Sequence, residues 1–247
     1  MFVRKSEGKM STDKRKVFEK GRIMSIKMKE QTCTMQALAT YNKYKKFVNN
    51  DRLPDFETQY CSNTGYICST TPWEHPIKLK INKLFIDDKS LGASLYHEFT
   101  HIYDYYHYIG QADNLKVVLR PYSEYHASQI EILKKYNLAT NILDEISVDA
   151  KDNRILDLLD EPAQYIESYY KNTIAGVKHD IETRYIYYMG VTDIVKRITG
   201  MELQTNDYMG CEKEKYIKIH KLLETTDYKQ HPDIDLIKTI YELYAEK

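Results

Sequence analysis

The sequence contains no long apolar segment. None of its 247 residues lies in a run that approaches the roughly 18 apolar residues needed for a membrane-spanning helix. Basic residues occur near the N-terminus, but no apolar stretch of the kind found in signal peptides follows them. We therefore expect a cytoplasmic protein with no membrane partner.

Cysteine is also scarce, with four residues at Cys33, Cys61, Cys68 and Cys211. Their spacing fits no common zinc pattern, and in a cytoplasmic protein we expect reduced thiols. Cys61 and Cys68 flank Asn63-Thr64-Gly65, which predicts the tip of a hairpin. We interpret these two cysteines as small buried apolar side chains.

Glycine is limited to nine residues, and the chain has neither internal repeats nor low-complexity tracts. Hydrophobic residues make up 42% and charged residues 29%, a balance typical of a globular rather than a disordered chain. The length is enough for one large domain or two small ones with a substantial core.

Charge is balanced overall but unevenly distributed. Residues 1–30 carry ten Lys and Arg against four Asp and Glu, so this segment has a net charge of +6 and the remainder −6. A basic arm can bind nucleic acid or an acidic surface. The simpler interpretation is a solvated N-terminal segment.

The residue pattern in the first half of the chain predicts both helices and a strand. Residues 12–50 read as helical, 51–76 as loop and short hairpin, and 77–86 as a half-exposed strand because apolar residues alternate with polar ones. A helix should follow from Leu91 to Ile109 and stop at Gly110.

Further helices should form the rest of the chain. Pro121 and Ser123 open one that runs to about Tyr136. The remaining predicted helices span 142–159, 161–172, 174–199, 213–225 and 233–246. The expected fold is α+β and mostly helical, with a catalytic core and its basic N-terminal segment over 1–140 and a helical region packed on it over 141–247.

A metal-site motif lies on the helix predicted to end at Gly110. His97 and His101 are four residues apart, so both rings project from one helix face and can bind one tetrahedral ion. Glu98 is placed to reach a water on that ion and act as general base. The pattern predicts a zinc site with Glu98 as the catalytic residue.

A catalytic zinc needs a third protein ligand, and the sequence offers several. His107 would complete a longer histidine motif, but a helix that continues to Gly110 turns it about 120° or more away from His101. Glu124 begins the next helix, which a short loop would return to the metal. This geometry favours Glu124 over His107, with Glu131, two turns further along, as the fallback.

Other polar side chains have less defined roles. Asp104 can orient a ligating histidine through its far nitrogen or bind a nearby Lys or Arg. The donor that stabilises an oxyanion can be His126 or one of several tyrosines. Those tyrosines are Tyr185, Tyr187 and Tyr188. We expect His179, His220 and His231 to lie on solvated helix faces.

Two short motifs together resemble a known family. His97-Glu98-x-x-His101-x-x-Asp104 and the later Ser123-Glu124-x-x-Ala127 are similar to the gluzincin-type peptidases of the mitochondrial ATP-synthase-assembly processing family. The anti-repressor-cleaving ImmA/IrrE peptidases have a related layout. The resemblance covers about residues 90–135 and implies a zincin-like core, with zinc on two histidines and Glu124.

The sequence therefore predicts a zinc metallopeptidase that hydrolyses peptide bonds of a peptide or protein substrate, with Glu98 as general base. The alternative is a zincin-like module without proteolytic activity that binds nucleic acid or protein in a regulatory or mobile-element system. The presence of Glu98 argues against the alternative, because binding alone needs no general base.

Overall fold

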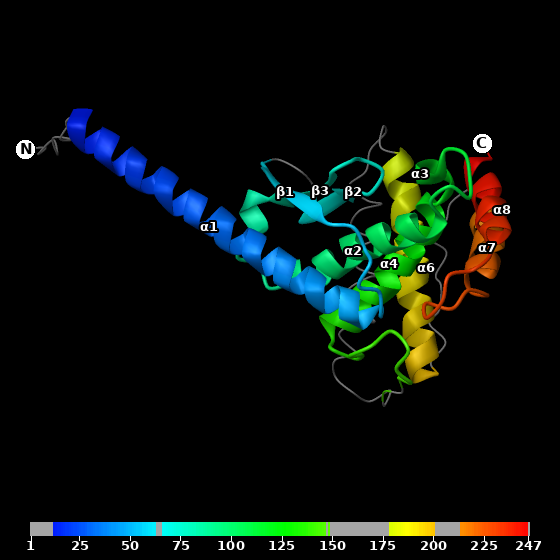
Figure 1. Ribbon diagram of the computed structural model, residues 1–247. Coiled ribbons are helices and arrows are strands. Elements are labelled where there is room, and N and C mark those ends of the chain that lie inside the picture. The colour runs from blue at the N-terminus through cyan, green and yellow to red at the C-terminus, as the bar shows by residue number, and fades with distance from the viewer. Residues whose placement is uncertain (1–11, 63–65, 147, 149–177, 201–212, 247) are drawn as a thin grey trace, which may run out of the picture.

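The computed structural model describes residues 12–62, 66–146, 148, 178–200 and 213–246, with side chains described except at 12–23, 178–181 and 213. The fold is α+β and mostly helical, as predicted (Figure 1). Within these residues, no helix combines the length and apolar character needed to cross a bilayer. The elements in chain order are α1 (Thr12–Phe47), β1 (Phe56–Cys61), β2 (Cys68–Thr71), β3 (Ile77–Asn82), the 3-10 turn η1 (Lys83–Phe85), α2 (Leu91–Tyr108), α3 (Leu115–Val118), α4 (Arg120–Lys135), α6 (Lys178–Thr199), α7 (Lys213–Leu223) and α8 (Ile234–Ala245).

The three strands form one mixed sheet in the order β1–β3–β2. β1 runs parallel to β3, and β2 runs antiparallel to it. The predicted hairpin between Cys61 and Cys68 is wrong, because the strands that carry these cysteines both pair with β3 instead of with each other. β3 lies at the centre, with β1 along one edge and β2 along the other, and its apolar side chains are buried on one face of the sheet. Those side chains are Ile77, Leu79 and Ile81.

β3 ends at Asn82, four residues earlier than predicted, because the chain tightens there into η1. The Asn82 side chain accepts a hydrogen bond from the Leu84 N–H at 3.1 Å and so caps this turn. Of the two edge strands, β2 packs more extensively along α2, although β3 is the strand that directly precedes this helix in sequence. Cys68 is buried, as interpreted, but Cys61 is only half-buried, and Cys211 lies outside the described residues.

α1 confirms the long helix predicted from residue 12, and its N-terminal part projects away from the rest of the molecule (Figure 1). Its C-terminal half packs against α2 through aromatic rings. Phe99 lies 4.7 Å from Tyr41 and 5.7 Å from Tyr44, measured between ring centroids. Phe99 also stacks on Phe56 of β1 at 5.6 Å, so α2 is fixed between α1 and the sheet.

α2 ends where the sequence predicts. Its last residue is Tyr108, and Gly110 adopts a positive φ of 81°, which glycine tolerates without steric cost. α4 begins at Arg120 with Pro121 in its first turn, and the short α3 occupies part of the predicted loop. α2 packs along α4, and α4 packs along α6.

Gly190 lies inside α6, at the point where this helix crosses α4. A Cβ atom at this position would lie 2.3 Å from the Tyr125 carbonyl oxygen and 2.0 Å from Ser128 Oγ. The absence of a side chain therefore lets the two helices approach closely, which fixes the position of α4.

The C-terminal helices share the hydrophobic core with the rest of the chain. One buried cluster joins α1, the sheet and α2 to Val191 and Ile194 of α6. A second joins Tyr122 and Tyr125 of α4 to α7 and α8. Residues on both sides of position 140 thus contribute to each cluster.

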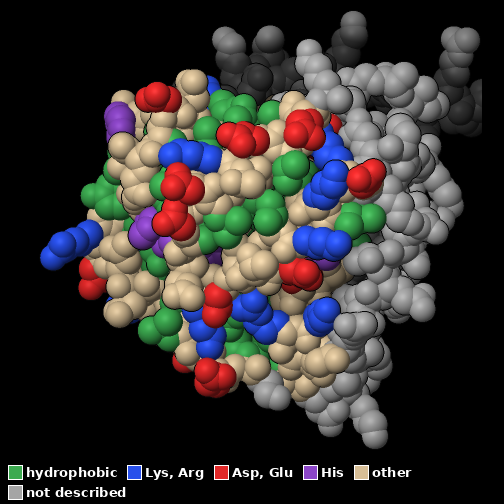
Figure 2. All heavy atoms as spheres, turned by 90° about the vertical axis from the view of Figure 1, so that its right-hand side faces the viewer, with side chains coloured by type: hydrophobic (Ala, Val, Ile, Leu, Met, Phe, Trp, Pro, Cys, Tyr) green, Lys and Arg blue, Asp and Glu red, His purple; other side chains and the backbone are tan. Residues whose placement is uncertain are grey.

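On the face of the molecule that includes the C-terminal helices, acidic and basic side chains are interspersed (Figure 2).

The predictions for the C-terminal half are confirmed in part. The helices expected at 174–199, 213–225 and 233–246 correspond to α6, α7 and α8. The helix expected from residue 142 is wrong over 142–146, where the chain is turn and irregular structure. The Asp144 carboxylate accepts hydrogen bonds from the Thr140 and Asn141 N–H groups, which favours a turn over a helix. Val148 is not helical either, and the other residues of that helix lie outside the described residues, as does the helix expected at 161–172.

Candidate metal centre

Three side chains of α2 form a group that can hold a metal ion. One ligand atom from each of His97, Glu98 and His101 lies within 4.8 Å of the others. The two histidines are one helical turn apart, and their ring centroids are separated by 4.8 Å. The structure therefore brings together the three residues that the motif predicts.

Glu124 of α4 faces the same two rings. Its Oε2 lies 3.5 Å from His97 Nε2, and its Oε1 lies 3.9 Å from His101 Nε2. Ligand atoms about 2.0–2.2 Å from one tetrahedral zinc ion are separated from each other by about 3.3–3.6 Å. The 3.5 Å separation falls within this range and the 3.9 Å separation slightly exceeds it, so two imidazoles and one carboxylate form a donor set that could hold a divalent metal ion.

His107 lies away from this group. Its exposed ring stacks on His231, with ring centroids 3.9 Å apart and an angle of 13° between the planes. Because α2 remains helical to Tyr108, His107 and His101 project in different directions, as the helical geometry predicts.

Glu131 contacts the opposite side of the His97 ring. Its Oε2 lies 3.1 Å from His97 Nδ1, at an angle outside hydrogen-bond geometry. The Tyr187 hydroxyl donates to the same oxygen at 3.0 Å, and Ser94 contacts the other oxygen at 3.4 Å. Glu131 therefore lies beside the far nitrogen of His97 as an ion-pair partner, while Nε2 of the same ring is directed at Glu124.

Ser123 and Asp104 hold the far nitrogen of His101. The Ser123 hydroxyl donates to Asp104 Oδ2 at 2.8 Å, so its oxygen accepts from His101 Nδ1 at 2.7 Å. These two hydrogen bonds place the ring proton of His101 on Nδ1 and leave a lone pair on Nε2 for a metal. Asp104 thus acts on the histidine through Ser123 rather than by direct contact.

Glu98 is held by the edge strand of the sheet. Its Oε2 accepts from the Thr70 N–H at 2.7 Å and from the Thr70 hydroxyl at 2.9 Å. Burial raises the pKa of Glu98 from 4.5 to about 7. A carboxyl group with this pKa can both accept and release a proton near neutral pH.

The neighbouring groups have charges suited to a cation. Burial lowers the pKa of His101 to about 4, so its imidazole is neutral. Burial opposes the charge on Glu124, but His101 and His97 outweigh it and lower its pKa to about 2. Burial also opposes a charge on His97, but Glu124 and Glu131 raise its pKa well above the usual range. Without metal, a proton on His97 offsets part of the negative charge of these two carboxylates.

The candidates for an oxyanion donor lie at different distances from this group. Tyr187 lies beside it, with its ring centroid 5.7 Å from that of His97. Tyr185 packs on Tyr216 within the second hydrophobic cluster. His126 is buried, and its two ring nitrogens face Asp104 and the Tyr228 carbonyl oxygen.

The expectation of solvated helix faces is wrong for His231. It lies between α7 and α8 rather than on a helix, and its side chain is only 5% exposed, because it contacts Asp104. His220 lies on α7 and pairs with Asp193 at 2.9 Å, and the side chain of His179 lies outside the described ones.

Sequence reasoning missed two positioning residues. Ser123 was interpreted only as a helix opener, although its place directly before Glu124 was a usable signal. Thr70 gave no signal, because its contact with Glu98 depends on how β2 packs against α2.

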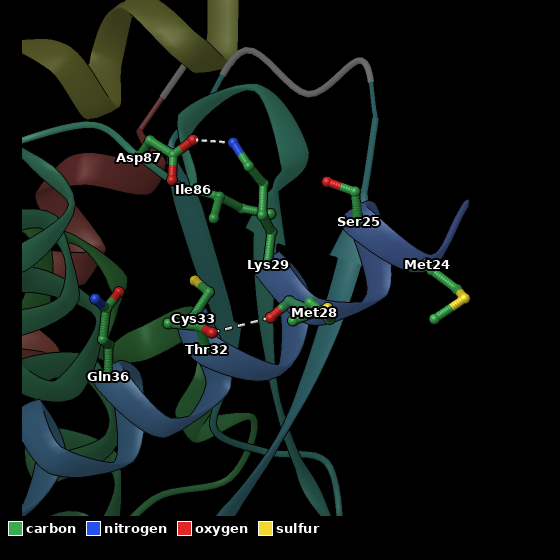
Figure 3. A pocket seen from close by; sticks show the side chains of 9 residues that line it. All are labelled: Met24, Ser25, Met28, Lys29, Thr32, Cys33, Gln36, Ile86 and Asp87. Atoms are coloured by element: carbon green, nitrogen blue, oxygen red, sulfur yellow. Dashed lines mark hydrogen bonds and ion pairs between the residues drawn. The ribbon is translucent and has the colours of Figure 1, made fainter. Parts of the chain in front are cut away.

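A separate pocket of about 510 Å³ lies between α1 and the segment before α2 (Figure 3). Met24 and Met28 line one side, and Ile86 and Asp87 line the other. Lys29 pairs with Asp87 across it. The pocket contains none of the predicted metal ligands.

No family model, curated protein or solved structure matches the chain.

Proposed function

We propose that the protein is a zinc-dependent metallopeptidase of the gluzincin type, with His97, His101 and Glu124 as zinc ligands. The observation that carries the proposal is the convergence of His97 Nε2, His101 Nε2 and the Glu124 carboxylate, with Glu98 in the same group. The far nitrogen of His101 is hydrogen-bonded to Ser123, and a carboxylate oxygen of Glu131 lies 3.1 Å from the far nitrogen of His97. This arrangement is what a zinc site requires to fix its ring orientations.

Zinc bound there would polarise a substrate carbonyl and lower the pKa of a water towards about 7. Glu98 then takes the proton of the attacking water and passes it to the leaving amine. The Thr70 N–H and hydroxyl keep the Glu98 carboxylate in place for both transfers.

The position of β2 supports a peptide as the substrate. β2 is an edge strand, and its residue Thr70 contacts the general base directly. Extended peptides bind sheet edges through main-chain hydrogen bonds, with side-chain pockets giving specificity. The motif resemblance over residues 90–135 supports the same substrate class.

The test compares zinc content and peptide cleavage in the wild type and Glu98→Gln. We expect Glu98→Gln to keep its zinc and lose at least about 100-fold in the rate of cleavage, because the general base is gone. Glu74→Gln, which makes the same charge change at an exposed position, is the control and should cleave normally. Full hydrolysis by Glu98→Gln would overturn the mechanism.

The projecting α1 favours a second candidate, a module that binds nucleic acid through the basic segment 1–30 (Figure 1). Retention on DNA should then weaken steeply with salt. Replacing the Lys and Arg residues of 1–30 by Gln should abolish it. Cleavage of peptides by the same substituted protein would separate this binding from the proposed catalysis.

A further inference from the structure

A second group of potential metal ligands lies behind the first. Asp104 of α2, His126 of α4 and His231, between α7 and α8, converge with one ligand atom each within 4.8 Å of the others. Asp104 Oδ1 is 2.8 Å from His126 Nδ1 and 3.0 Å from His231 Nε2. The side chains of these three residues are 0%, 2% and 5% exposed.

The two ring nitrogens of His126 have different partners: Nε2 faces Tyr228 and Nδ1 faces Asp104. The Tyr228 carbonyl oxygen lies 3.1 Å from His126 Nε2 and can only accept, so Nε2 carries a proton. His126 Nδ1 lies 2.8 Å from Asp104 Oδ1, so a proton or a metal ion must lie between these two atoms.

Asp104 itself requires positive charge around it. Burial opposes its ionisation, but His126 and His231 outweigh burial and hold its pKa well below the usual range. A buried carboxylate is costly unless a cation or several hydrogen bonds compensate it. Its other oxygen is already satisfied by Ser123.

We propose that Asp104, His126 and His231 bind a second divalent transition-metal ion, distinct from the one at His97, His101 and Glu124. Two imidazoles and one carboxylate suit zinc and its first-row neighbours. Binding at about 2.0–2.2 Å needs the Asp104 oxygen and the two histidine nitrogens to move apart by about 0.3–0.8 Å.

The ion would have a structural role. Its ligands come from α2, α4 and the segment between α7 and α8, which are separated by up to 127 residues. Their cross-link fastens the C-terminal helices onto the metal-site helix. The ion would also restrict the position of Asp104, which is hydrogen-bonded to Ser123. Ser123 in turn is hydrogen-bonded to His101, so the two sites are linked by a series of hydrogen bonds.

The test removes the first site and counts metal at the second. After equilibration with zinc and dialysis, mass spectrometry of the metal should give two equivalents for the wild type and one for His97→Ala/Glu124→Gln. Adding His231→Gln to that variant should remove the remaining equivalent. Adding His220→Gln instead should not, because His220 pairs with Asp193 elsewhere and serves as the matched control.

Two results would overturn the proposal. One is a wild type with a single zinc that His97→Ala/Glu124→Gln abolishes, which would leave the proposed peptidase site intact and assign the buried cation to a proton on His126. The other is an unchanged zinc content when His231→Gln is added to His97→Ala/Glu124→Gln.

If the His231→Gln protein does not fold, ring-nitrogen NMR of His97→Ala/Glu124→Gln decides the question. We expect zinc to shift the resonances of His126 Nδ1 and His231 Nε2. Unchanged resonances would reject the second site.

Discussion

At the scale of single residues, Glu98 is an ionisable group in an environment that disfavours its charge. Its side chain is buried between α2 and the edge strand, and Thr70 supplies its two hydrogen bonds. Burial still prevails, and the pKa is raised from 4.5 to about 7. Burial therefore makes Glu98 a better proton acceptor, but it also lowers the free energy of unfolding when the carboxyl group is ionised.

Because the pKa of Glu98 is raised, replacing this residue by Gln should increase the free energy of unfolding, and the increase should depend on pH. The folded protein holds the proton more tightly than the unfolded chain, so stability is lost as pH rises from 4.5 to about 7. At about 1.4 kcal/mol per pKa unit, metal-free Glu98→Gln should be more stable than the wild type by up to about 3 kcal/mol at pH 8.

Urea unfolding in chelator at pH 8 and pH 4.5 measures this effect. The difference in unfolding free energy between wild type and Glu98→Gln should nearly vanish at pH 4.5, where the unfolded carboxyl group also binds a proton. Glu74→Gln controls for the loss of a carboxylate at an exposed site. An equal difference at both pH values would show that the buried charge is not its source.

Ser123 is predicted to matter because it passes the influence of Asp104 to His101. Ser123→Ala removes the acceptor for His101 Nδ1 and frees the ring to rotate. We expect about a 10- to 100-fold loss of zinc affinity or peptidase activity, the range seen when such supporting bonds are removed. Competition with a zinc chelator measures the affinity.

Ser128→Ala is the matched control for Ser123→Ala. Ser128 is a buried serine of the same helix, but its hydroxyl bonds to the Tyr125 carbonyl of its own helix instead of to the metal site. Equal losses of zinc affinity in the two variants would show that Ser123 acts only through packing.

At the scale of elements, the placement of α4 depends on its close approach to α6. Gly190→Ala should destabilise the protein by about 1–3 kcal/mol, because its Cβ would meet the Tyr125 carbonyl oxygen of the facing backbone. Gly92→Ala is the control: its Cβ meets nothing within 4 Å, and alanine there should stabilise α2 by up to about 1 kcal/mol. Chemical denaturation of both variants gives the comparison, and similar stabilities would contradict the tight crossing.

The elements also show what sequence can predict and what it cannot. α2 and its end at Gly110 follow from local spacing and turn chemistry, and so does the start of α4 near Pro121. Strand order does not follow, because the pairing of β1 and β2 with β3 depends on contacts between segments that local patterns do not encode. The helix expected from residue 142 failed because hydrogen bonds to the Asp144 side chain compete with helix formation.

At the scale of the whole molecule, the C-terminal helices are part of the site rather than a separate layer. Tyr187 of α6 bonds to Glu131, and His231 contacts Asp104. Neither contact was predictable from sequence, because each joins residues more than fifty positions apart. His97, Glu98 and His101 were predictable because one helix carries all three, and Glu124 because the next helix returns to them.

The central claim is a zinc ion held by His97, His101 and Glu124. Diffraction from zinc-loaded crystals at the zinc absorption edge tests it most directly, since anomalous peaks locate each ion. We predict a peak about 2.0–2.2 Å from His97 Nε2, His101 Nε2 and a Glu124 carboxylate oxygen. A peak bound by His107 or Glu131 in place of Glu124, or no peak at His97 and His101, would contradict it.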